Sequence, residues 1–197
     1  MRQIRISITA IFLFTLLCGI IYPAAITAIA RGAFPWLSQG SLITASGKPA
    51  GSALIGQAFT KTGYFHGRPS ATDPQYNARA SAASNAGPTN ARFLAQVRER
   101  AERLREEHGA ATESAIPADL VTASASGLDP HISLEAALFQ VRRVARERKM
   151  DVAEIEAIIR QHVEGPFLGF WGKERVNVLL LNRGLDLYQG ERHEKSG

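Results

Sequence analysis

The stretch ISITAIFLFTLLCGIIYPAAITAIA, residues 6–30, contains no charged side chain and sets the organisation of the whole chain. As an α-helix of about 25 residues it would be ~37 Å long, more than the ~30 Å hydrocarbon core of a bilayer. Inside lipid every peptide group must find a partner within its own segment, which favours a helix. We therefore predict one transmembrane helix over residues 6–30, with a kink where Pro23 removes a backbone donor.

The charges on either side of this helix predict its orientation. Arg2 and Arg5 precede it, and the positive-inside tendency then places residues 1–5 in the cytoplasm. Residues 31–197 would form an extracytoplasmic, periplasmic domain of a single-pass inner (plasma) membrane protein. The alternative is a cleaved secretory leader, because Ala28-Ile29-Ala30 fits a small-x-small cleavage site. We favour the retained anchor, since the apolar region of a leader is usually only about 7–15 residues long.

Composition excludes several classes of function. Three of the 23 basic residues, Arg2, Arg5 and Arg31, flank the apolar run, and the other 20 nearly balance 18 acidic ones. No basic patch interleaved with aromatics is present, so we predict no nucleic-acid partner. The only cysteine, Cys18, cannot form an internal disulfide. We predict no metal site, because ligand spacing is lacking among the histidines, which are His66, His108, His131, His162 and His193.

The rest of the chain predicts a single compact α+β domain after the transmembrane helix. Two extended segments are expected at 41–45 and 52–59, about a turn at 47–49. A helix capped by Thr89 or Asn90 should end at Gly109. Residues 110–120 would connect it to the next part of the chain. The apolar face of this helix comprises Phe93, Leu94, Val97, Ala101 and Leu104.

Two further helices are predicted after residue 132. The first runs from Ser133 to about Lys149, with an apolar side formed by Leu134, Leu138, Val141, Val144 and Ala145. The second begins at Asp151, which has the spacing of a capping box with Glu154, and ends by Gly165-Pro166. It should bury Ile155, Ile158 and Ile159. The stretch RVNVLLLNRGLDLY, residues 175–188, could be a buried strand or a short helix.

Residues 60–90 are dense in Gly, Pro, Ser, Asn and Asp and show neither helical nor strand periodicity. A loop this long in a compact domain is usually functional or disordered. Its aromatic residues, Tyr64, Phe65 and Tyr76, indicate that it packs onto something. We predict an ordered loop that binds a partner.

The segment VTASASGLDPHIS, residues 121–133, allows two interpretations. Ser126, Asp129 and His131 could serve a membrane-anchored periplasmic serine hydrolase. Triad residues normally come from separate parts of a fold, however, and the G-x-S-x-G turn is absent. In the other interpretation Gly127 permits a turn and Ser133 caps the following helix. We favour the second, so no catalytic residue is predicted.

Several segments together resemble the C chain of the bacterial high-affinity potassium-transporting ATPase, the KdpC family. They are GSALIGQAFT at 51–60, YFHGRPSA at 64–71, SNAGPTN at 84–90, DLVTASASGLDPHIS at 119–133, RVAR at 143–146 and VNVLLLN at 176–182. With the anchor they follow the family's order along nearly the whole chain. The set is specific, although no single segment would be.

The resemblance implies a non-catalytic accessory subunit of an ATP-driven potassium uptake complex. Its partners would be a channel-like potassium-selecting subunit, a P-type ATP-hydrolysing subunit, a small single-helix subunit and the lipid bilayer. The family is described as a catalytic chaperone that raises the ATP affinity of the hydrolysing subunit, so an association with ATP is implied by the resemblance alone. Some relatives carry an L-S-x-x-Q stretch, and the corresponding slot here, residues 150–154, lacks the serine and the glutamine. No other cofactor is predicted.

The resemblance and the loop composition together give a hypothesis for how the chain contacts its partners. The anchor would pack against the channel-like subunit, with the extracytoplasmic domain over its outer mouth. There the domain would stabilise assembly and shape potassium entry. On the anchor, the expected contact residues are Ile6, Phe12, Phe14, Leu17, Ile21, Tyr22, Pro23 and Ile26. In the loops they are Tyr64, Phe65, His66, Gly67, Arg68, Pro69, Asn85, Gly87, Pro88, Asn90, Ser124, Ser126, Gly127, Asp129, Pro130 and His131.

Overall fold

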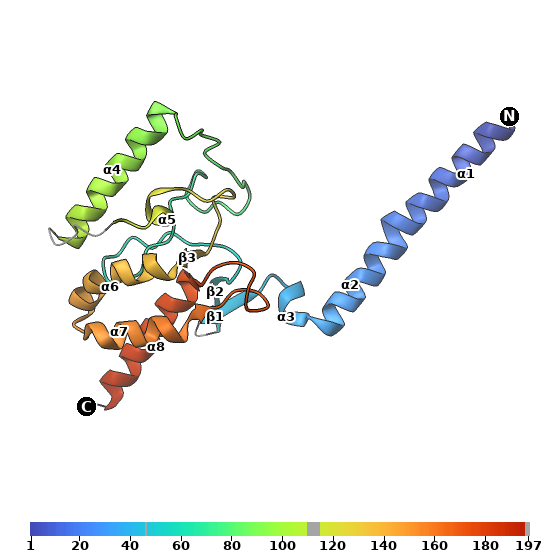
Figure 1. Cartoon of the computed structure of the whole chain (residues 1–197). Coiled ribbons are helices and arrows are strands. Elements are labelled where there is room, and N and C mark those ends of the chain that lie inside the picture. Colours follow the sequence, from blue (N-terminus) through green and yellow to red (C-terminus); the bar gives the residue numbers. More distant parts are fainter. Residues whose placement is uncertain (46, 110–114, 196–197) are drawn as a thin grey trace. The chain divides into compact units, whose positions relative to one another are not determined.

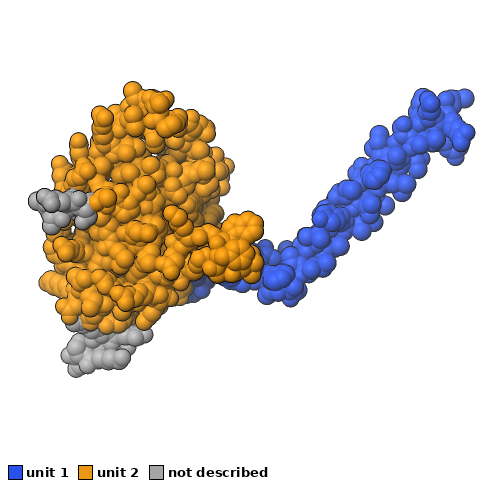
Figure 2. Space-filling model, viewed as in Figure 1, with its two compact units in different colours: residues 1–52 blue, residues 53–197 orange. Residues whose placement is uncertain are grey.

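The computed structural model describes residues 1–45, 47–109 and 115–195, and contacts divide the chain into two compact units. Unit 1 comprises residues 1–52 and unit 2 the remainder (Figure 2). Residues 110–114 of the expected connection after the first soluble helix lie outside the described residues.

Unit 1 begins with a helical stretch of 32 residues, from Arg2 to Ala33, long and apolar enough to cross a membrane. It consists of α1 (Arg2–Leu16), a π-helical turn η1 (Leu17–Ile21) and α2 (Tyr22–Ala33) (Figure 1), and none of its side chains is buried. The π-turn ends two residues before Pro23, whose ring would clash with the carbonyl four residues earlier in a regular α-helix. The Tyr22 amide instead donates to the Leu17 carbonyl. The wider turn therefore accommodates the proline ring within the helix.

A short helix, α3 (Pro35–Ser38), leads into an antiparallel hairpin of β1 (Leu42–Ala45) and β2 (Lys48–Ser52). The first expected strand is confirmed. The second, at 52–59, is wrong, because the chain turns earlier and β2 already ends at Ser52. Pro49 is tolerated in β2 because a two-stranded sheet leaves each strand with an open edge. The register shifts after Ile43, which leaves an extra residue in β2.

Unit 2 is built from three helices and a small antiparallel sheet, which confirms the α+β class. The helices are α6 (Leu134–Arg148), α7 (Val152–Gln161) and α8 (Val178–Lys195). The strands are β3 (His131–Ser133), β4 (Val163–Glu164) and β5 (Arg175–Asn177), in the order β3-β5-β4. Two more helices, α4 (Ala91–His108) and the short α5 (Ala118–Val121), complete it (Figure 1).

Local signals set the helix ends as the sequence predicts. Asn90 accepts from the Phe93 amide at the start of α4, and Ser133 accepts from the Ala136 amide at the start of α6. The capping box of Asp151 and Glu154 is present. α7 ends at Gln161, four residues before Gly165, because β4 follows directly. The ambiguous stretch 175–188 contains both elements, a strand to Asn177 and then the first part of α8.

The buried face of α6 differs from the expected one. Leu138 is 41% exposed, whereas Gln140 and Arg143 are 1% and 2% exposed. A polar side chain is stable in such a position only when its hydrogen bonds are satisfied. The partners of these two side chains lie in residues 62–66, far away in the sequence.

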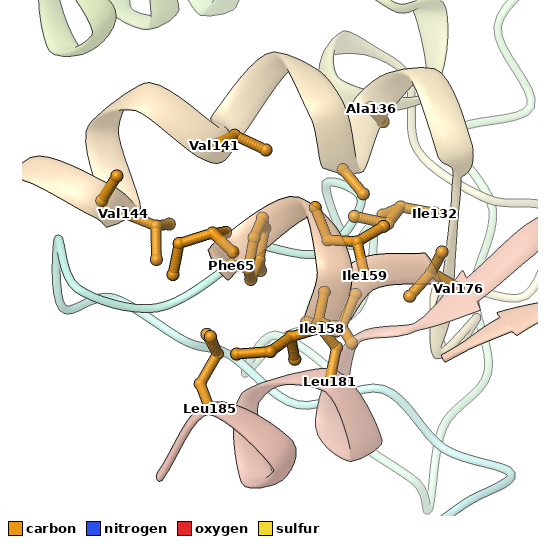
Figure 3. Close-up of a cluster of buried hydrophobic side chains, with 14 of the residues drawn as sticks. Phe65, Ile132, Ala136, Val141, Val144, Ile158, Ile159, Val176, Leu181 and Leu185 are labelled. Atoms are coloured by element: carbon orange, nitrogen blue, oxygen red, sulfur yellow. The ribbon is translucent and has the colours of Figure 1, made fainter. Parts of the chain in front are cut away.

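Residues 62–66 enter the core as an extended segment held by side chains. Phe65 is fully buried between α6, α7 and α8 (Figure 3). Its amide donates to Asn182 Oδ1 (2.8 Å), and its carbonyl accepts from Asn182 Nδ2 (2.9 Å). Gln140 makes the same pair of bonds to His66, at 2.8 and 3.1 Å. Each amide side chain therefore replaces the neighbouring strand that this segment lacks.

Two arginines complete the attachment of this segment. Arg143 donates to the carbonyls of Thr62 and Tyr64 and also to Gln140 Oε1. Arg148 donates to the Gly63 carbonyl, pairs with Asp186 at 2.9 Å and lies over the Tyr64 ring. The loop is therefore ordered without regular secondary structure, as the sequence predicts.

Helix α4 contacts the rest of unit 2 through a looser surface. None of its side chains is buried, and its expected apolar face is only partly covered. In its last turn the His108 ring packs on Phe139, with centroids 4.6 Å apart. Neither ring nitrogen has a hydrogen-bond partner among the described residues. Partial burial of the ring, with help from the charges of Arg143 and His66, lowers the pKa of His108 from its usual 6.5 to about 4.

Replacing Asn182 by Leu should lower the free energy of unfolding by roughly 2–5 kcal/mol, because both backbone groups of Phe65 lose their buried partner. Leucine has the same number of side-chain heavy atoms in the same branched arrangement and is the larger residue, so a cavity would not account for the loss. Gln161→Leu, an amide replaced at an exposed position of α7, is the matched control. Urea unfolding followed by circular dichroism measures both. Equal stability of the two variants would contradict the role given to Asn182.

Acid should weaken unit 2 through His108. Between pH 6.5 and about 4 the unfolded chain binds a proton at His108 that the folded chain excludes, so the free energy of unfolding falls as the pH falls. The lowered pKa of His66, caused by burial and then by Arg143, acts in the same direction. His108→Phe keeps a ring against Phe139 and should flatten this dependence. Thermal unfolding at a series of pH values, taken as the difference from the parent chain, is the measurement. An unchanged slope would show that His108 is not responsible.

Candidate functional site

Two irregular loops, residues 66–82 and 122–130, are joined by hydrogen bonds that converge on Ser70. Its hydroxyl donates to the Gly127 carbonyl (2.7 Å) and accepts from the amides of Thr72 (3.2 Å) and Tyr76 (3.1 Å). The Ala82 amide also donates to the Ser126 carbonyl at 3.0 Å. These bonds give both loops one fixed shape.

Tyr76 fixes the start of the first loop. Its hydroxyl donates to the Arg68 carbonyl at 2.6 Å. Its ring leaves no room for a side chain at Gly56, where a Cβ atom would lie 2.3 Å from it, or at Gly67. Burial, reinforced by Asp129, raises the pKa of Tyr76 to about 12. The phenol therefore stays protonated and works as a structural donor.

The segment 121–133 is a series of turns closed by its own polar side chains. The Gly127 amide donates to Ser124 Oγ (2.9 Å), and the Leu128 amide donates to Ser126 Oγ (3.1 Å). Gly127 has a φ of 69°, and a Cβ there would lie 2.6 Å from the Ala82 carbonyl oxygen. Glycine is thus required on both conformational and steric grounds. The interpretation as a shaped loop is confirmed.

The structure does not assemble a serine hydrolase triad from this segment. His131 Nδ1 lies 3.5 Å from Asp129 Oδ1, but Nε2 lies 3.5 Å from a second carboxylate, Glu164. Among the described residues, the Ser126 hydroxyl has its hydrogen bond to the backbone and none to this ring. A general base must be within hydrogen-bond reach of the nucleophile's proton, and this arrangement of Ser126, Asp129 and His131 does not provide that contact.

A charged hollow of about 600 Å³ lies beside β3. Arg68 at its wall donates to Asp129 (3.2 Å), and Asp119 accepts from the Ser133 amide (2.6 Å). Burial alone would raise the pKa of Asp129, but hydrogen bonds from His131 and the Arg68 charge lower it overall. Residues of both signs line the hollow, including Glu135, Lys173, Glu174 and Arg175. Such a surface suits polar recognition and shows no acid–base arrangement for chemistry.

The predicted contact residues of the loops fall into three groups. Four are buried and cannot face a partner in this structure, which corrects the prediction for Phe65, Ser124, Gly127 and Pro130. Eight are partly exposed around the joined loops, namely Tyr64, His66, Gly67, Arg68, Pro69, Ser126, Asp129 and His131. The last group is exposed on a separate stretch that leads into α4, formed by Asn85, Gly87, Pro88 and Asn90.

The predicted contact residues of the anchor are all exposed. At about 100° per residue they are distributed around the helix and do not share one face. They comprise Ile6, Phe12, Phe14, Leu17, Ile21, Tyr22, Pro23 and Ile26. The helix therefore presents apolar surface on all sides, which suits lipid as well as neighbouring helices.

The slot at residues 150–154 does not fit a nucleotide. The Asp151 amide donates to Glu154 Oε2 (3.0 Å), while Glu154 Oε1 accepts from the Tyr188 hydroxyl (3.2 Å). Met150 is buried. Both carboxylates thus occupy the positive end of α7 where a phosphate would have to bind, and they would repel it.

One prominent feature was missed by the sequence interpretation, which used Gly165-Pro166 only as a helix stop. The eight residues GPFLGFWG, 165–172, form a tip between β4 and β5. Its large side chains, Phe167, Leu168, Phe170 and Trp171, are 70–75% exposed. The signal that could have found it is a short aromatic run enclosed by glycines, with no period that would bury it.

Comparison with known proteins gives consistent results. The family model described as K+-transporting ATPase, c chain, matches residues 4–187. A potassium-transporting ATPase KdpC subunit of Janthinobacterium sp. (strain Marseille) is 51% identical over 183 residues, 92% of this chain and 96% of that protein. Those of Geobacter sulfurreducens and Rhodopseudomonas palustris (strain BisB18) are 51% and 48% identical, and each match covers 94% of this chain and 98% of the relative. Since the family model and the relatives all cover nearly the whole length, this chain belongs to the KdpC family, the C chains of K+-transporting ATPases.

Proposed function

We propose that this chain is a non-catalytic accessory subunit of an ATP-driven, high-affinity potassium uptake complex. The helical stretch Arg2–Ala33 holds it in the inner membrane, with the N-terminus in the cytoplasm and unit 2 on the periplasmic side. The observation that carries the proposal is the use of polar groups in 121–133. Ser124, Ser126 and Asp129 all accept hydrogen bonds from backbone amides of the same segment. In this proposal their role is to fix the shape of the loop, not to react with a substrate.

The fixed shape of the joined loops supports a role in assembly. Loops 66–82 and 122–130 are irregular, yet side-chain hydrogen bonds hold them in one conformation. A surface that is already ordered loses less conformational entropy when a partner binds. Their partly exposed residues and the exposed stretch 85–90 would contact the channel-like potassium-selecting subunit. The anchor would contact the membrane helices of that subunit, the P-type ATP-hydrolysing subunit and the small single-helix subunit.

An effect on ATP affinity would be indirect in this arrangement. Unit 2 lies across the membrane from cytoplasmic ATP, and the carboxylates at 151 and 154 are engaged at the start of α7. The chain would raise the ATP affinity of the hydrolysing subunit by favouring one conformation of the complex. A ligand or subunit can shift such an equilibrium only through its different affinity for the two states.

Protease added to intact spheroplasts should digest unit 2 and leave a fragment containing the anchor. The expectation follows from Arg2 and Arg5 on the cytoplasmic side. Immunoblots with tags at each end of the chain give the readout, and a cytoplasmic protein in the same cells serves as the control for lysis. Survival of the C-terminal tag until the cells are lysed would exclude the proposed orientation.

A tryptophan at Gly87 should weaken assembly without disturbing the fold. A Cβ atom at this position meets no heavy atom within 4 Å, and the same holds at Gly190 on α8. Gly190→Trp is therefore a matched control on a surface that we do not assign to a partner. If residues 85–90 contact the channel-like subunit, Gly87→Trp should reduce the affinity of the chain for that subunit at least ~10-fold, or about 1.4 kcal/mol.

The measurement is the amount of each partner subunit that copurifies with the tagged chain in mild detergent. Thermal unfolding of both variants checks that the fold is intact. Equal recovery of partners with the two variants would remove the stretch 85–90 from the interface. Assembly and potassium affinity that persisted after deletion of the whole of unit 2 would contradict the accessory role itself.

A further inference from the structure

The tip at residues 165–172 is an exposed apolar feature that the proposed function leaves unused. It contains no charged side chain and only one polar side-chain group, the indole N–H of Trp171, and the first charges beside it are Glu164 and Lys173. Phe167, Leu168, Phe170 and Trp171 are 70%, 71%, 75% and 71% exposed. An exposed apolar group of this size on a soluble surface marks an interaction site. We propose that this tip inserts into the interfacial layer of the lipid bilayer and acts as a second membrane contact of the chain.

The backbone of the tip is already suited to a water-poor environment. The Phe167 amide donates to the Trp171 carbonyl (2.8 Å), and the Trp171 amide returns to the Phe167 carbonyl (2.9 Å). The amides of Gly169 and Phe170 donate to Pro166 and Phe167. Pro166 itself has no donor. Buried backbone groups must be paired within their own segment where lipid replaces water, and most donors of this tip satisfy that condition.

The left-handed backbone at the end of the tip explains how four large side chains can project together. Leu168 has a φ of 55° and Gly169 a φ of 82°, so the chain reverses within the segment that the Phe167–Trp171 bridge closes. A reversal this tight leaves no interior in which the side chains could be buried. The conformation thus exposes the aromatic rings and leucine, and a membrane offers the surface that covers them.

The covalent connection keeps unit 2 close to the bilayer. Ser52, the last residue of unit 1, donates from its hydroxyl to the Gly40 carbonyl at 2.7 Å. Residues 34–52 connect the membrane helix to unit 2, but this hydrogen bond brings Ser52 back beside Gly40, so the path through residues 34–40 sets the reach of the connection. At ~3.5 Å per residue they span at most about 25 Å. A domain of about 145 residues has a radius of gyration of ~15 Å, so its surface remains within reach of the headgroups.

The composition of the tip favours lipid over a protein as the partner that covers it. Protein interfaces combine an apolar centre with a polar rim that forms about one hydrogen bond per 100–200 Å², whereas the side chains of residues 165–172 offer one polar group, the indole N–H of Trp171. Tryptophan and phenylalanine suit the boundary between headgroups and acyl chains. Lys173, directly after the tip, is placed to meet anionic headgroups.

Tryptophan fluorescence of the full-length chain tests the insertion. The chain has two tryptophans, so Trp36→Phe leaves Trp171 as the only reporter. The protein is reconstituted without partner subunits into vesicles of phosphatidylethanolamine and phosphatidylglycerol, with or without bromine atoms on the upper acyl chains. Insertion should quench Trp171 at least about twofold with brominated lipid, because an interfacial indole lies near those atoms. It should also protect Trp171 from iodide added outside the vesicles.

Matched variants separate insertion from general proximity to the membrane. Phe170→Asp places a charge in the tip and should abolish both the quenching and the protection. Leu187→Asp alters a residue on α8 that is 58% exposed and should leave both unchanged. Because the tip side chains are exposed, the thermal unfolding temperature should be unchanged in both variants.

Two outcomes would overturn the proposal. In the first, iodide quenches the fluorescence of Trp171 in the vesicles and brominated lipid does not. In the second, protection appears only after the partner subunits are added, with no quenching by brominated lipid, which would assign the tip to a protein interface. Neither outcome bears on the proposed accessory role, which the copurification of partner subunits tests separately.

Discussion

The extended segment 62–66 has no neighbouring strand, and the rest of unit 2 depends on how its backbone is satisfied. Asn182 and Gln140 each present an amide that donates and accepts, so each pairs with one residue as an adjacent strand would. Arg143 takes up two further carbonyls. These buried groups come from α8 and α6, and they hold Phe65 in the core between the same helices (Figure 3). Loss of one partner leaves the others buried and unpaired, which is costly in a low-dielectric interior.

This attachment also explains how an accessory subunit can present ordered loops with little regular structure. Once residues 62–66 are fixed, Tyr76 packs against Gly56 and Gly67, and Ser70 connects the first loop to Gly127. Hydrogen bonds from the first loop then hold residues 122–130 in place. Side-chain hydrogen bonds therefore connect the proposed contact surface to the core. Rigid surfaces on a firm scaffold are what recognition requires, since little entropy is lost on binding.

The parts of the fold that were predictable from the sequence are those determined by neighbouring residues. Asn90, Ser133 and Asp151 cap their helices through bonds that span three positions, and the apolar run 6–30 lies within one continuous helix. The burial of Gln140 and Arg143 was not predictable, because their partners lie about 75 to 80 residues away. Helical periodicity therefore favoured Leu138 for the core, although it is exposed. The candidate site shows the same division. The turns of 121–133 were anticipated, but the burial of Pro130, whose carbonyl accepts from the distant Val178 amide, was not.

The aromatic tip and the anchor are apolar for related physical reasons, although only the anchor was identified from the sequence. A helix that spans lipid satisfies its backbone continuously, so its signal is a long run without charges. For insertion into the interfacial layer the tip needs only eight residues. The chain reverses within them, so most of its amide donors are paired inside the tip. Only the outward-facing side chains then have to be apolar. A domain attached by one helix can rotate about that connection. A second contact at the tip would remove much of this freedom before any partner binds, and would present the joined loops in a restricted orientation. Assembly would then cost less orientational entropy, which is the same advantage that the fixed loops provide at a smaller scale.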